Sequence, residues 1–174
     1  THHHWDHTQA IHAVKTATNA KVVGFAEDAH RIPFIDTTVQ DNETLKLSPN
    51  LKPQIIHNAG HTTGAISYYF AKQKALFVGD TLFTMGVGRM FEGTPEIYVN
   101  SLEKLMALPA DTAIYTGHEY AANNAKFASF VDKGNLDVKK RIENFKTINQ
   151  PTLLQDELQT NPFLRLKSNN IIEC

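Results

Sequence analysis

The sequence contains one cysteine, Cys174 at its last position, so an intramolecular disulfide is excluded. The lack of cysteine ligands also argues against a closed structural zinc site. A single thiol suits a reducing compartment, and we expect a cytoplasmic protein. No apolar run approaches the roughly 18 residues that a membrane span requires, so no membrane partner is expected.

An excess of charge of either sign is also lacking, because 17 Lys and Arg residues stand against 18 Asp and Glu residues. No strong overall field would therefore attract nucleic acid or an anionic membrane surface. A chain of 174 residues with 41% hydrophobic residues can bury one sizeable core. These features predict an ordinary globular protein, and we expect a monomer with a small-molecule partner.

Strand and helix patterns divide the chain near residue 118. Short apolar runs predict strands at Lys21–Phe25, Gln54–Ala59, Ala65–Phe70, Ala75–Val78 and Thr112–Thr116, with weaker candidates at Thr37–Gln40 and Leu45–Leu47. Helices are predicted at Thr8–Ala17, from Thr94-Pro95 to Met106, and at Tyr120–Val131, Leu136–Ile148 and Thr152–Gln159. We therefore expect an α/β (α+β) domain over residues 1–118 and a helical subdomain over residues 119–174.

The opening stretch, Thr1 to His7, reads THHHWDH and concentrates ligand-type side chains. In an extended segment the side chains at i and i+2 point to one side, so His2 and His4 would face one metal while His3 points away. Asp6 and His7 follow Trp5, where a turn of the chain would let them reach a second metal. A purification tag would be a longer uninterrupted histidine run, so we interpret the stretch as a metal-binding motif.

Three predicted strands are each followed by a glycine and a residue able to bind a metal. These pairs are Gly60-His61, Gly79-Asp80 and Gly117-His118. Glycine permits a sharp turn where a strand leaves its sheet. If the strands are neighbours, their ligands gather at one edge, where histidine and carboxylate ligands suit zinc or iron.

The motifs resemble those of the metallo-β-lactamase superfamily, and in particular of glyoxalase II, the hydroxyacylglutathione hydrolases. The opening stretch is similar to the superfamily signature THxHxDH. Further similarities extend to about residue 165 and lie in Gly60–Gly64 (GHTTG), Gly79–Phe83 (GDTLF), Gly86–Gly93 (GVGRMFEG), Gly117–Tyr120 (GHEY) and Asn161–Arg165 (NPFLR).

The resemblance implies an αββα sandwich with a two-metal site at the sheet edge and a helical domain that helps to hold glutathione. By position, His2, His4 and His61 would bind one metal, and Asp6, His7 and His118 would bind the other. Asp80 would bridge both metals and orient the attacking hydroxide. Zinc is the expected metal, with iron or manganese as alternatives. Arg89, Phe91 and Tyr120 would contact glutathione, whereas His12, His30 and His57 are expected to have ordinary structural roles.

Some positions differ from the family pattern. Ala65 stands where many relatives have a further histidine that is not a ligand, and Phe91 stands where tyrosine is frequent. Relatives also have strands before the opening motif and a basic C-terminal tail. We therefore expect the sandwich and the substrate cleft to be incomplete in the sequence as it stands.

The implied activity is hydrolysis of S-D-lactoylglutathione, a 2-hydroxyacylglutathione, to D-lactate and glutathione, as in the removal of methylglyoxal. Two alternatives remain at this stage. One is an iron dioxygenase of the same fold that acts on glutathione persulfide and uses His2, His61 and Asp80 as a facial triad. The other is a metal-binding fragment without catalytic activity.

Overall fold

The computed structural model describes residues 1–144 and 151–172, and its centre is a five-stranded sheet. The strand order is β3-β4-β5-β8-β9, where β5 and β8 are parallel and the other neighbours are antiparallel. The strands are β3 (Gln54–His57), β4 (Ile66–Phe70), β5 (Ala75–Gly79), β8 (Ala113–Thr116) and β9 (Thr152–Leu153). The four principal strands predicted for this region are confirmed, with ends shifted by up to two residues.

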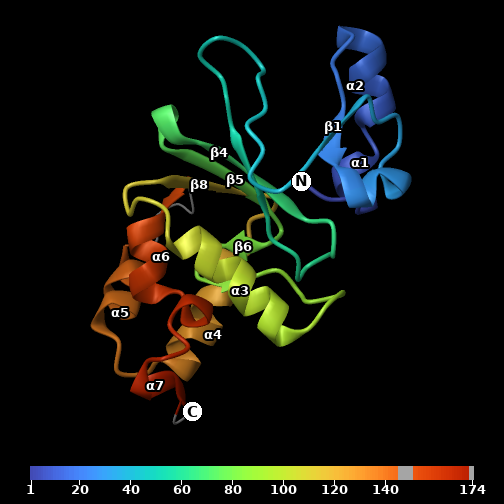
Figure 1. Cartoon of the computed structure of the whole chain (residues 1–174). Helices are drawn as coiled ribbons and strands as arrows, with labels where there is room; N and C mark the ends of the chain where they lie inside the picture. The colour runs from blue at the N-terminus through green and yellow to red at the C-terminus, as the bar shows by residue number, and fades with distance from the viewer. Residues whose placement is uncertain (145–150, 173–174) are drawn as a thin grey trace.

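The sheet is buried on both faces, because neighbouring residues of a strand point to opposite sides. In β3, Ile56 joins the main core under the helices, whereas Ile55 joins a smaller core on the other face. Tyr69 of β4 likewise belongs to the main core, while Ile66 belongs to the smaller one. This alternation makes the sheet the middle layer of the molecule (Figure 1).

Helix α3 (Pro95–Met106) lies in the crossover between the parallel strands β5 and β8. Its start agrees with the sequence, because Thr94 is the N-cap and its hydroxyl accepts a hydrogen bond from the Ile97 amide. Tyr98, Leu102 and Leu105 are buried against the sheet. The two-residue strands β6 (Leu82–Phe83) and β7 (Gly86–Val87) form a hairpin between Asp80 and α3.

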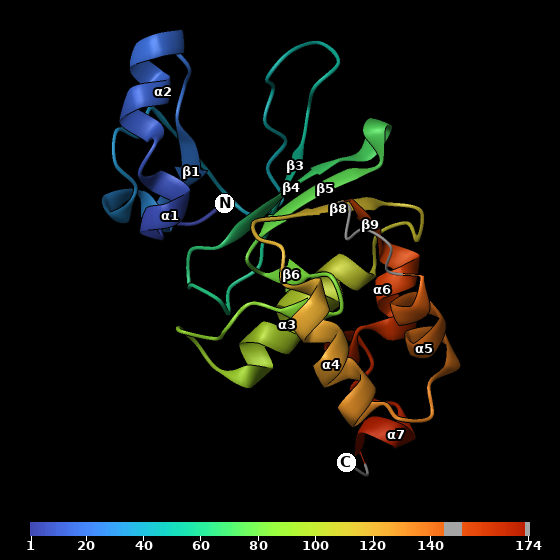
Figure 2. The same cartoon turned by 180° about the vertical axis from the view of Figure 1, so that it is seen from behind.

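The N-terminal residues form a second layer that Figures 1 and 2 show on the far side of the sheet from α3. This layer holds α1 (Trp5–Thr8), α2 (Ile11–Thr18) and the parallel strands β1 (Val23–Phe25) and β2 (Thr37–Val39), joined by the 3-10 helix η1 (Ala26–Arg31). Phe25 and Val39 pack on the smaller core of the sheet. The helix predicted from Thr8 begins at Ile11, and the weak strand candidate at Thr37–Gln40 is confirmed.

Residues after 118 form α4 (Ala121–Val131), α5 (Leu136–Glu143), α6 (Leu154–Thr160), the 3-10 helix η3 (Pro162–Leu164) and α7 (Asn169–Ile172). The prediction of one helix over Thr152–Gln159 is wrong at its start, because Thr152 and Leu153 form β9 and pair with β8. The edge of β8 is free to pair with these two residues, so they extend the sheet before α6 begins. The predicted end of the helix Leu136–Ile148 lies partly outside the described residues.

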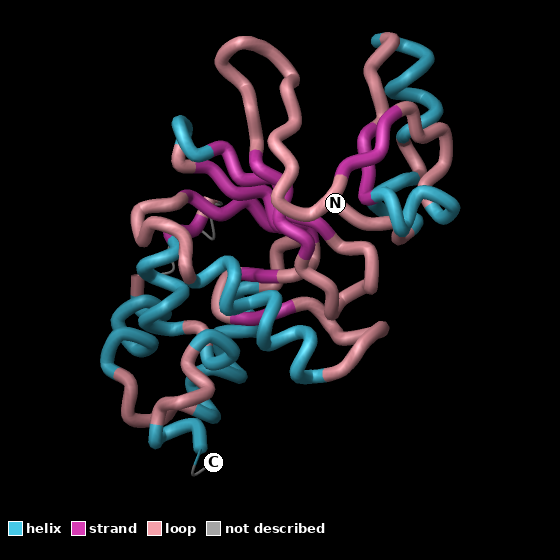
Figure 3. The backbone as a smooth tube through the Cα atoms, in the orientation of Figure 1, coloured by secondary structure: helices cyan, strands magenta, loops and turns pink. Residues whose placement is uncertain are grey.

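The segment Leu45–Leu47 is not a strand. It belongs to a long loop, drawn in pink in Figure 3, that closes on itself through hydrogen bonds from Leu45 to Pro53 and from Leu47 to Leu51. Thr44 forms a single bridge with Gln54 of β3 and Leu45 packs on the smaller core, but the pairing does not continue into a strand. Within the described ranges, no helix combines the length and the apolar character needed to cross a membrane.

Candidate metal centre

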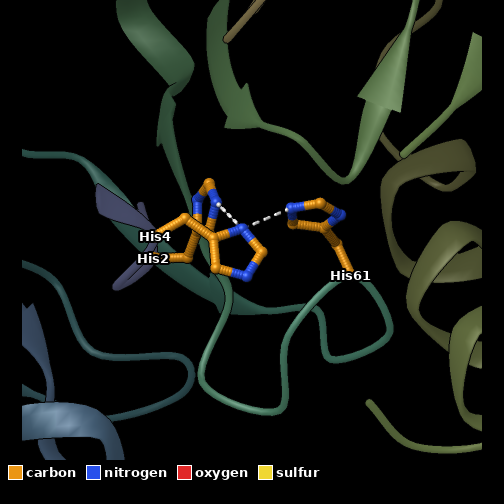
Figure 4. Close-up of side chains that lie close together, drawn as sticks. All are labelled: His2, His4 and His61. Carbon is orange, nitrogen blue, oxygen red and sulfur yellow. Dashed lines mark hydrogen bonds between the residues drawn. The ribbon is translucent and has the colours of Figure 1, made fainter. Parts of the chain in front are cut away.

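His2, His4 and His61 form the first of three overlapping groups of possible ligands, one of which joins His2, His7 and Asp80. His2 and His4 lie in the extended segment before α1, and His61 lies in the turn between β3 and β4. The Nδ1 atom of His4 is 3.1 Å from Nε2 of His2 and 3.0 Å from Nε2 of His61 (Figure 4). The three ring nitrogens therefore face a common point, with His2 and His61 buried.

Asp6, His7 and His118 form the second group. Asp6 and His7 lie on α1, the single helical turn that follows Trp5, and His118 comes directly after the Gly117 turn at the end of β8. The Nε2 atom of His118 is 3.0 Å from Oδ2 of Asp6 and 3.2 Å from Nε2 of His7. Segments separated by 111 residues thus meet in one set of ligand atoms.

Asp80 lies between the two groups, immediately after β5. Its Oδ2 atom is 3.6 Å from Nε2 of His61 and 3.5 Å from Nε2 of His118. Its buried Oδ1 atom lies 3.2 Å from His7 but has no hydrogen-bond partner in the described part of the chain. A buried carboxylate oxygen without a partner is costly, and a cation would remove that cost. The position of Asp80 therefore fits a bridge between two metals.

Burial favours the neutral, metal-binding form of His2 and His4, and a hydrogen bond orients His61. His61 donates from Nδ1 to the Arg89 carbonyl at 2.8 Å, so its Nε2 atom carries a lone pair toward the cluster. Burial, followed by the neighbouring His7 and His61, lowers the pKa of His2 to about 2. Burial also lowers the pKa of His4. Imidazole lone pairs and carboxylates in this arrangement fit a divalent cation.

Gly117 allows the second group to approach Asp80. A Cβ atom at this position would lie 2.2 Å from Oδ1 of Asp80 and 2.7 Å from Cε1 of His7. Any side chain would therefore displace at least one of the two residues. The glycine that precedes His118 is required by this close approach and not only by the end of the strand.

We expect Gly117→Ala to lower the affinity for metal by at least about tenfold. This is the smallest loss usually caused by removing a residue that hydrogen-bonds to a metal ligand. The added methyl group would push Asp80 and His7 out of position, since both lie within contact distance of it. Titration of the apo-protein with zinc, followed by calorimetry, measures the effect. Gly134→Ala is a matched control, because its Cβ would meet only an Asn170 side-chain atom at 3.2 Å. Wild-type affinity in Gly117→Ala would contradict the geometry.

The residues expected to contact substrate lie at the edge of this cluster. The ring of Phe91 is 5.5 Å from that of His4 and 5.3 Å from that of His61, and the Tyr120 ring stacks on His118 at 5.4 Å. Both rings are exposed. The Arg89 guanidinium lies over the Phe91 ring at 5.4 Å from its centroid. The two aromatic rings therefore flank the two ligand groups.

The other histidines lie outside the ligand groups. His57 stacks on Phe25 and bonds to the Thr63 carbonyl, and His12 lies beside Phe34. No ligand group contains His30, which is exposed on η1. His3 points away from the cluster and donates to Asp28. Trp5, the residue after His4, has a side chain that is 73% exposed.

Asp28, Arg31 and Glu92 were not recognised from the sequence, although they contact His3 and Thr63, which lie near the ligands in the sequence. Asp28 is 1% exposed and bonds both His3 and Arg31. Arg31 also pairs with Glu92 of the GVGRMFEG stretch. The signals available were the i, i+3 spacing of Asp28 and Arg31 and the acidic residue in the loop motif, but neither reveals its partner in the fold.

Comparison with known families assigns both parts of the chain. Residues 1–118 match the metallo-beta-lactamase superfamily, and residues 119–174 match the C-terminus of hydroxyacylglutathione hydrolase. A hydroxyacylglutathione hydrolase from Methylococcus capsulatus is 42% identical over 98% of this chain and 69% of its own length. The chain belongs to the hydroxyacylglutathione hydrolase family of the metallo-β-lactamase superfamily.

Other members and structures agree with this family. The hydroxyacylglutathione hydrolase of Rhodospirillum rubrum is 42% identical over 100% of this chain and 70% of its own length. The crystal structure of ETHE1 from Myxococcus xanthus is similar with a TM-score of 0.71 and 28% identity, over 99% of this chain and 64% of that chain. The expected fold is confirmed. Together with the histidine and aspartate groups, the metallo-β-lactamase fold implies that this hydrolase family member binds divalent metal.

Proposed function

We propose that the protein hydrolyses S-D-lactoylglutathione, a 2-hydroxyacylglutathione, to D-lactate and glutathione with two zinc ions. The observation that carries the proposal is the pair of ligand groups with Asp80 between them. A facial triad for a single iron needs only three ligands and leaves the group of Asp6, His7 and His118 without a role. Two adjacent groups suit a two-metal hydrolase.

The two ligand groups and Asp80 would hold two metals, which when bound would supply a hydroxide at neutral pH and polarise the thioester carbonyl. The protein residues hold this chemistry in place. Asp80 fixes the separation of the two groups and accepts the hydrogen bond that orients the nucleophile. His61 is held by its bond to the Arg89 carbonyl, so its free nitrogen keeps one direction. The thiolate of glutathione leaves readily, and the reaction therefore needs no strong general acid.

The glutathione part of the substrate is assigned to the exposed edge of the site. Tyr120 carries a hydroxyl beside the second group, and the Arg89 guanidinium can pair with a carboxylate. Phe91 offers an apolar surface beside the first group without the hydroxyl of a tyrosine. One end of the substrate is therefore bound by contacts that do not take part in bond cleavage.

Metal analysis combined with a hydrolysis assay tests the proposed function. We expect two equivalents of zinc per chain, hydrolysis of S-D-lactoylglutathione, loss of activity with a chelator and recovery on return of zinc. Oxygen consumption with glutathione persulfide is the second assay. One iron per chain together with oxygen uptake would support the dioxygenase and reject the hydrolase. A zinc-loaded protein that leaves the thioester intact would also reject the hydrolase.

Arg89→Ala is expected to raise KM about tenfold with little change in kcat, because a contact with a distant carboxylate binds the substrate and the transition state equally. Steady-state kinetics with S-D-lactoylglutathione measures both constants. Lys72→Ala removes another exposed cation, which lies in the turn between β4 and β5. This variant is expected to leave KM unchanged. A loss of kcat in Arg89→Ala with metals retained would show a different role for the residue.

A further inference from the structure

The loop Gly86–Gly93, called the substrate loop below, is hydrogen-bonded to a proposed ligand. The Arg89 carbonyl accepts the bond from His61 Nδ1, and the Phe91 amide donates to the His61 carbonyl at 3.3 Å. At Gly88 the loop backbone lies so close that a Cβ would be 1.8 Å from the Asp80 carbonyl oxygen. Arg89 and Phe91, two of the side chains assigned to glutathione, are therefore carried by backbone that packs on the metal centre.

Glu92 anchors the end of this loop to a different part of the chain. Its Oε2 atom accepts bonds from the Thr63 amide at 2.6 Å and the Thr63 hydroxyl at 2.8 Å. Arg31 donates to both oxygens of the same carboxylate, from Nη1 at 2.6 Å and from Nη2 at 3.2 Å. The hydrogen bonds from Arg31 are the main cause that lowers the pKa of Glu92 to about 2.

Arg31 also forms a hydrogen-bonded ion pair with a buried carboxylate, that of Asp28. Its Nε atom donates to Oδ1 of Asp28, and the other oxygen of Asp28 accepts a bond from His3 at 3.1 Å. Gly64 leaves room for this carboxylate, because a Cβ there would lie 2.3 Å from the Asp28 side chain. A continuous polar chain therefore runs from the opening histidine segment through Asp28 and Arg31 to the substrate loop.

We propose that Arg31 and Glu92 are positioning residues that hold the substrate loop in the geometry in which Arg89 and Phe91 meet glutathione. This inference rests on the proposed function. The planar guanidinium binds the carboxylate through two parallel bonds, which fixes orientation as well as distance. A loop ordered before binding avoids the entropy cost of ordering during binding, so the pair acts on affinity for substrate.

Glu92→Gln is the decisive variant, because it removes the charge of the carboxylate and leaves the bond between Arg31 and Asp28 in place. We expect KM to rise about three- to tenfold, with kcat within about twofold of wild type and metal content unchanged. Calorimetry with glutathione should show a matching loss of affinity. Hydrogen exchange should be faster in the amides of the substrate loop and unchanged in the sheet.

Two further variants control this experiment. Lys104 lies on α3, away from the substrate loop, and its ion pair with Asp41 also joins distant segments. Lys104→Met removes this pair and should leave KM unchanged. The double variant Arg31→Met/Glu92→Gln should raise KM no more than the stronger single change, since both remove one interaction. Additive effects of the two changes would contradict a shared role.

An unchanged KM and unchanged loop exchange in Glu92→Gln would overturn the inference, as would a loss of metal that explains the whole effect. The failure of the proposed function is a separate result. A wild-type protein that does not hydrolyse the thioester would reject that function, whereas loop exchange in Glu92→Gln would still decide whether the pair holds the loop.

Discussion

Asp80→Ala is expected to abolish hydrolysis and to release at least one metal per chain. The carboxylate lies within 3.6 Å of ring nitrogens from both ligand groups, so its removal separates them. Loss of a residue that only hydrogen-bonds to a metal ligand already lowers metal affinity about 10- to 100-fold. Loss of a ligand shared by both metals should lower it further. Elemental analysis of the purified variant and a single-turnover hydrolysis assay measure both effects.

His12→Ala is the control. His12 lies on α2, its ring packs beside Phe34, and it belongs to no ligand group. It should retain both metals and full activity. If Asp80→Ala kept two metals per chain and a kcat within tenfold of wild type, the bridging role would be wrong. Loss of activity with both metals retained would assign Asp80 to orientation of the nucleophile alone.

The convergence of the candidate ligands follows from local rules that a sequence displays. His2 and His4 are two residues apart in an extended segment, so both face the same side, while His3 points to Asp28. Asp80 directly follows β5, and His118 follows β8 after one residue, Gly117. The two strands are parallel neighbours that end at one edge. Spacing and strand ends therefore predict that these residues meet, provided that the strands are neighbours in the sheet.

Other features depend on partners that no local rule identifies. Arg31 and Glu92 are 61 residues apart, and each alone resembles an ordinary surface charge. The strand β9 exists because the edge of β8 is available, although Thr152 and Leu153 precede a helix without a break. The Leu45–Leu47 segment has a strand-like sequence, but its backbone bonds go to Leu51 and Pro53 on the other side of its own loop. Tertiary partners decide such cases over local preference.

Glu157, in the C-terminal segment, also depends on partners that are distant in the sequence. Its side chain is 0% exposed, which is unusual for a carboxylate. One oxygen accepts bonds from Arg141 at 2.6 Å and Thr152 at 2.7 Å, and the other accepts bonds from the Met85 amide at 2.8 Å and Asn161 at 3.0 Å. Asn161, from the NPFLR motif, also donates to the carbonyls of the β6–β7 hairpin. The network thus joins the C-terminal helices to the hairpin that follows Asp80.

Glu157→Ala is expected to lower the free energy of unfolding by about 3 kcal/mol or more, because it leaves Arg141 and the Met85 amide without their buried acceptor. For a chain of this size, such a loss lowers Tm by roughly 10 °C. Thermal unfolding followed by circular dichroism measures it, with metal bound and with metal removed. The loss should appear in both states, since the network does not include the ligands.

Gln155→Ala changes an exposed residue on the same helix and should shift Tm by no more than about 2 °C, the range of ordinary surface substitutions. Arg141→Met/Glu157→Leu tests the cause more directly. It removes both charges together, so it should be more stable than Glu157→Ala, because replacing a buried pair by apolar side chains costs less than leaving one charge alone. If the double variant were the less stable of the two, an unpaired Arg141 charge would not explain the loss of stability in Glu157→Ala.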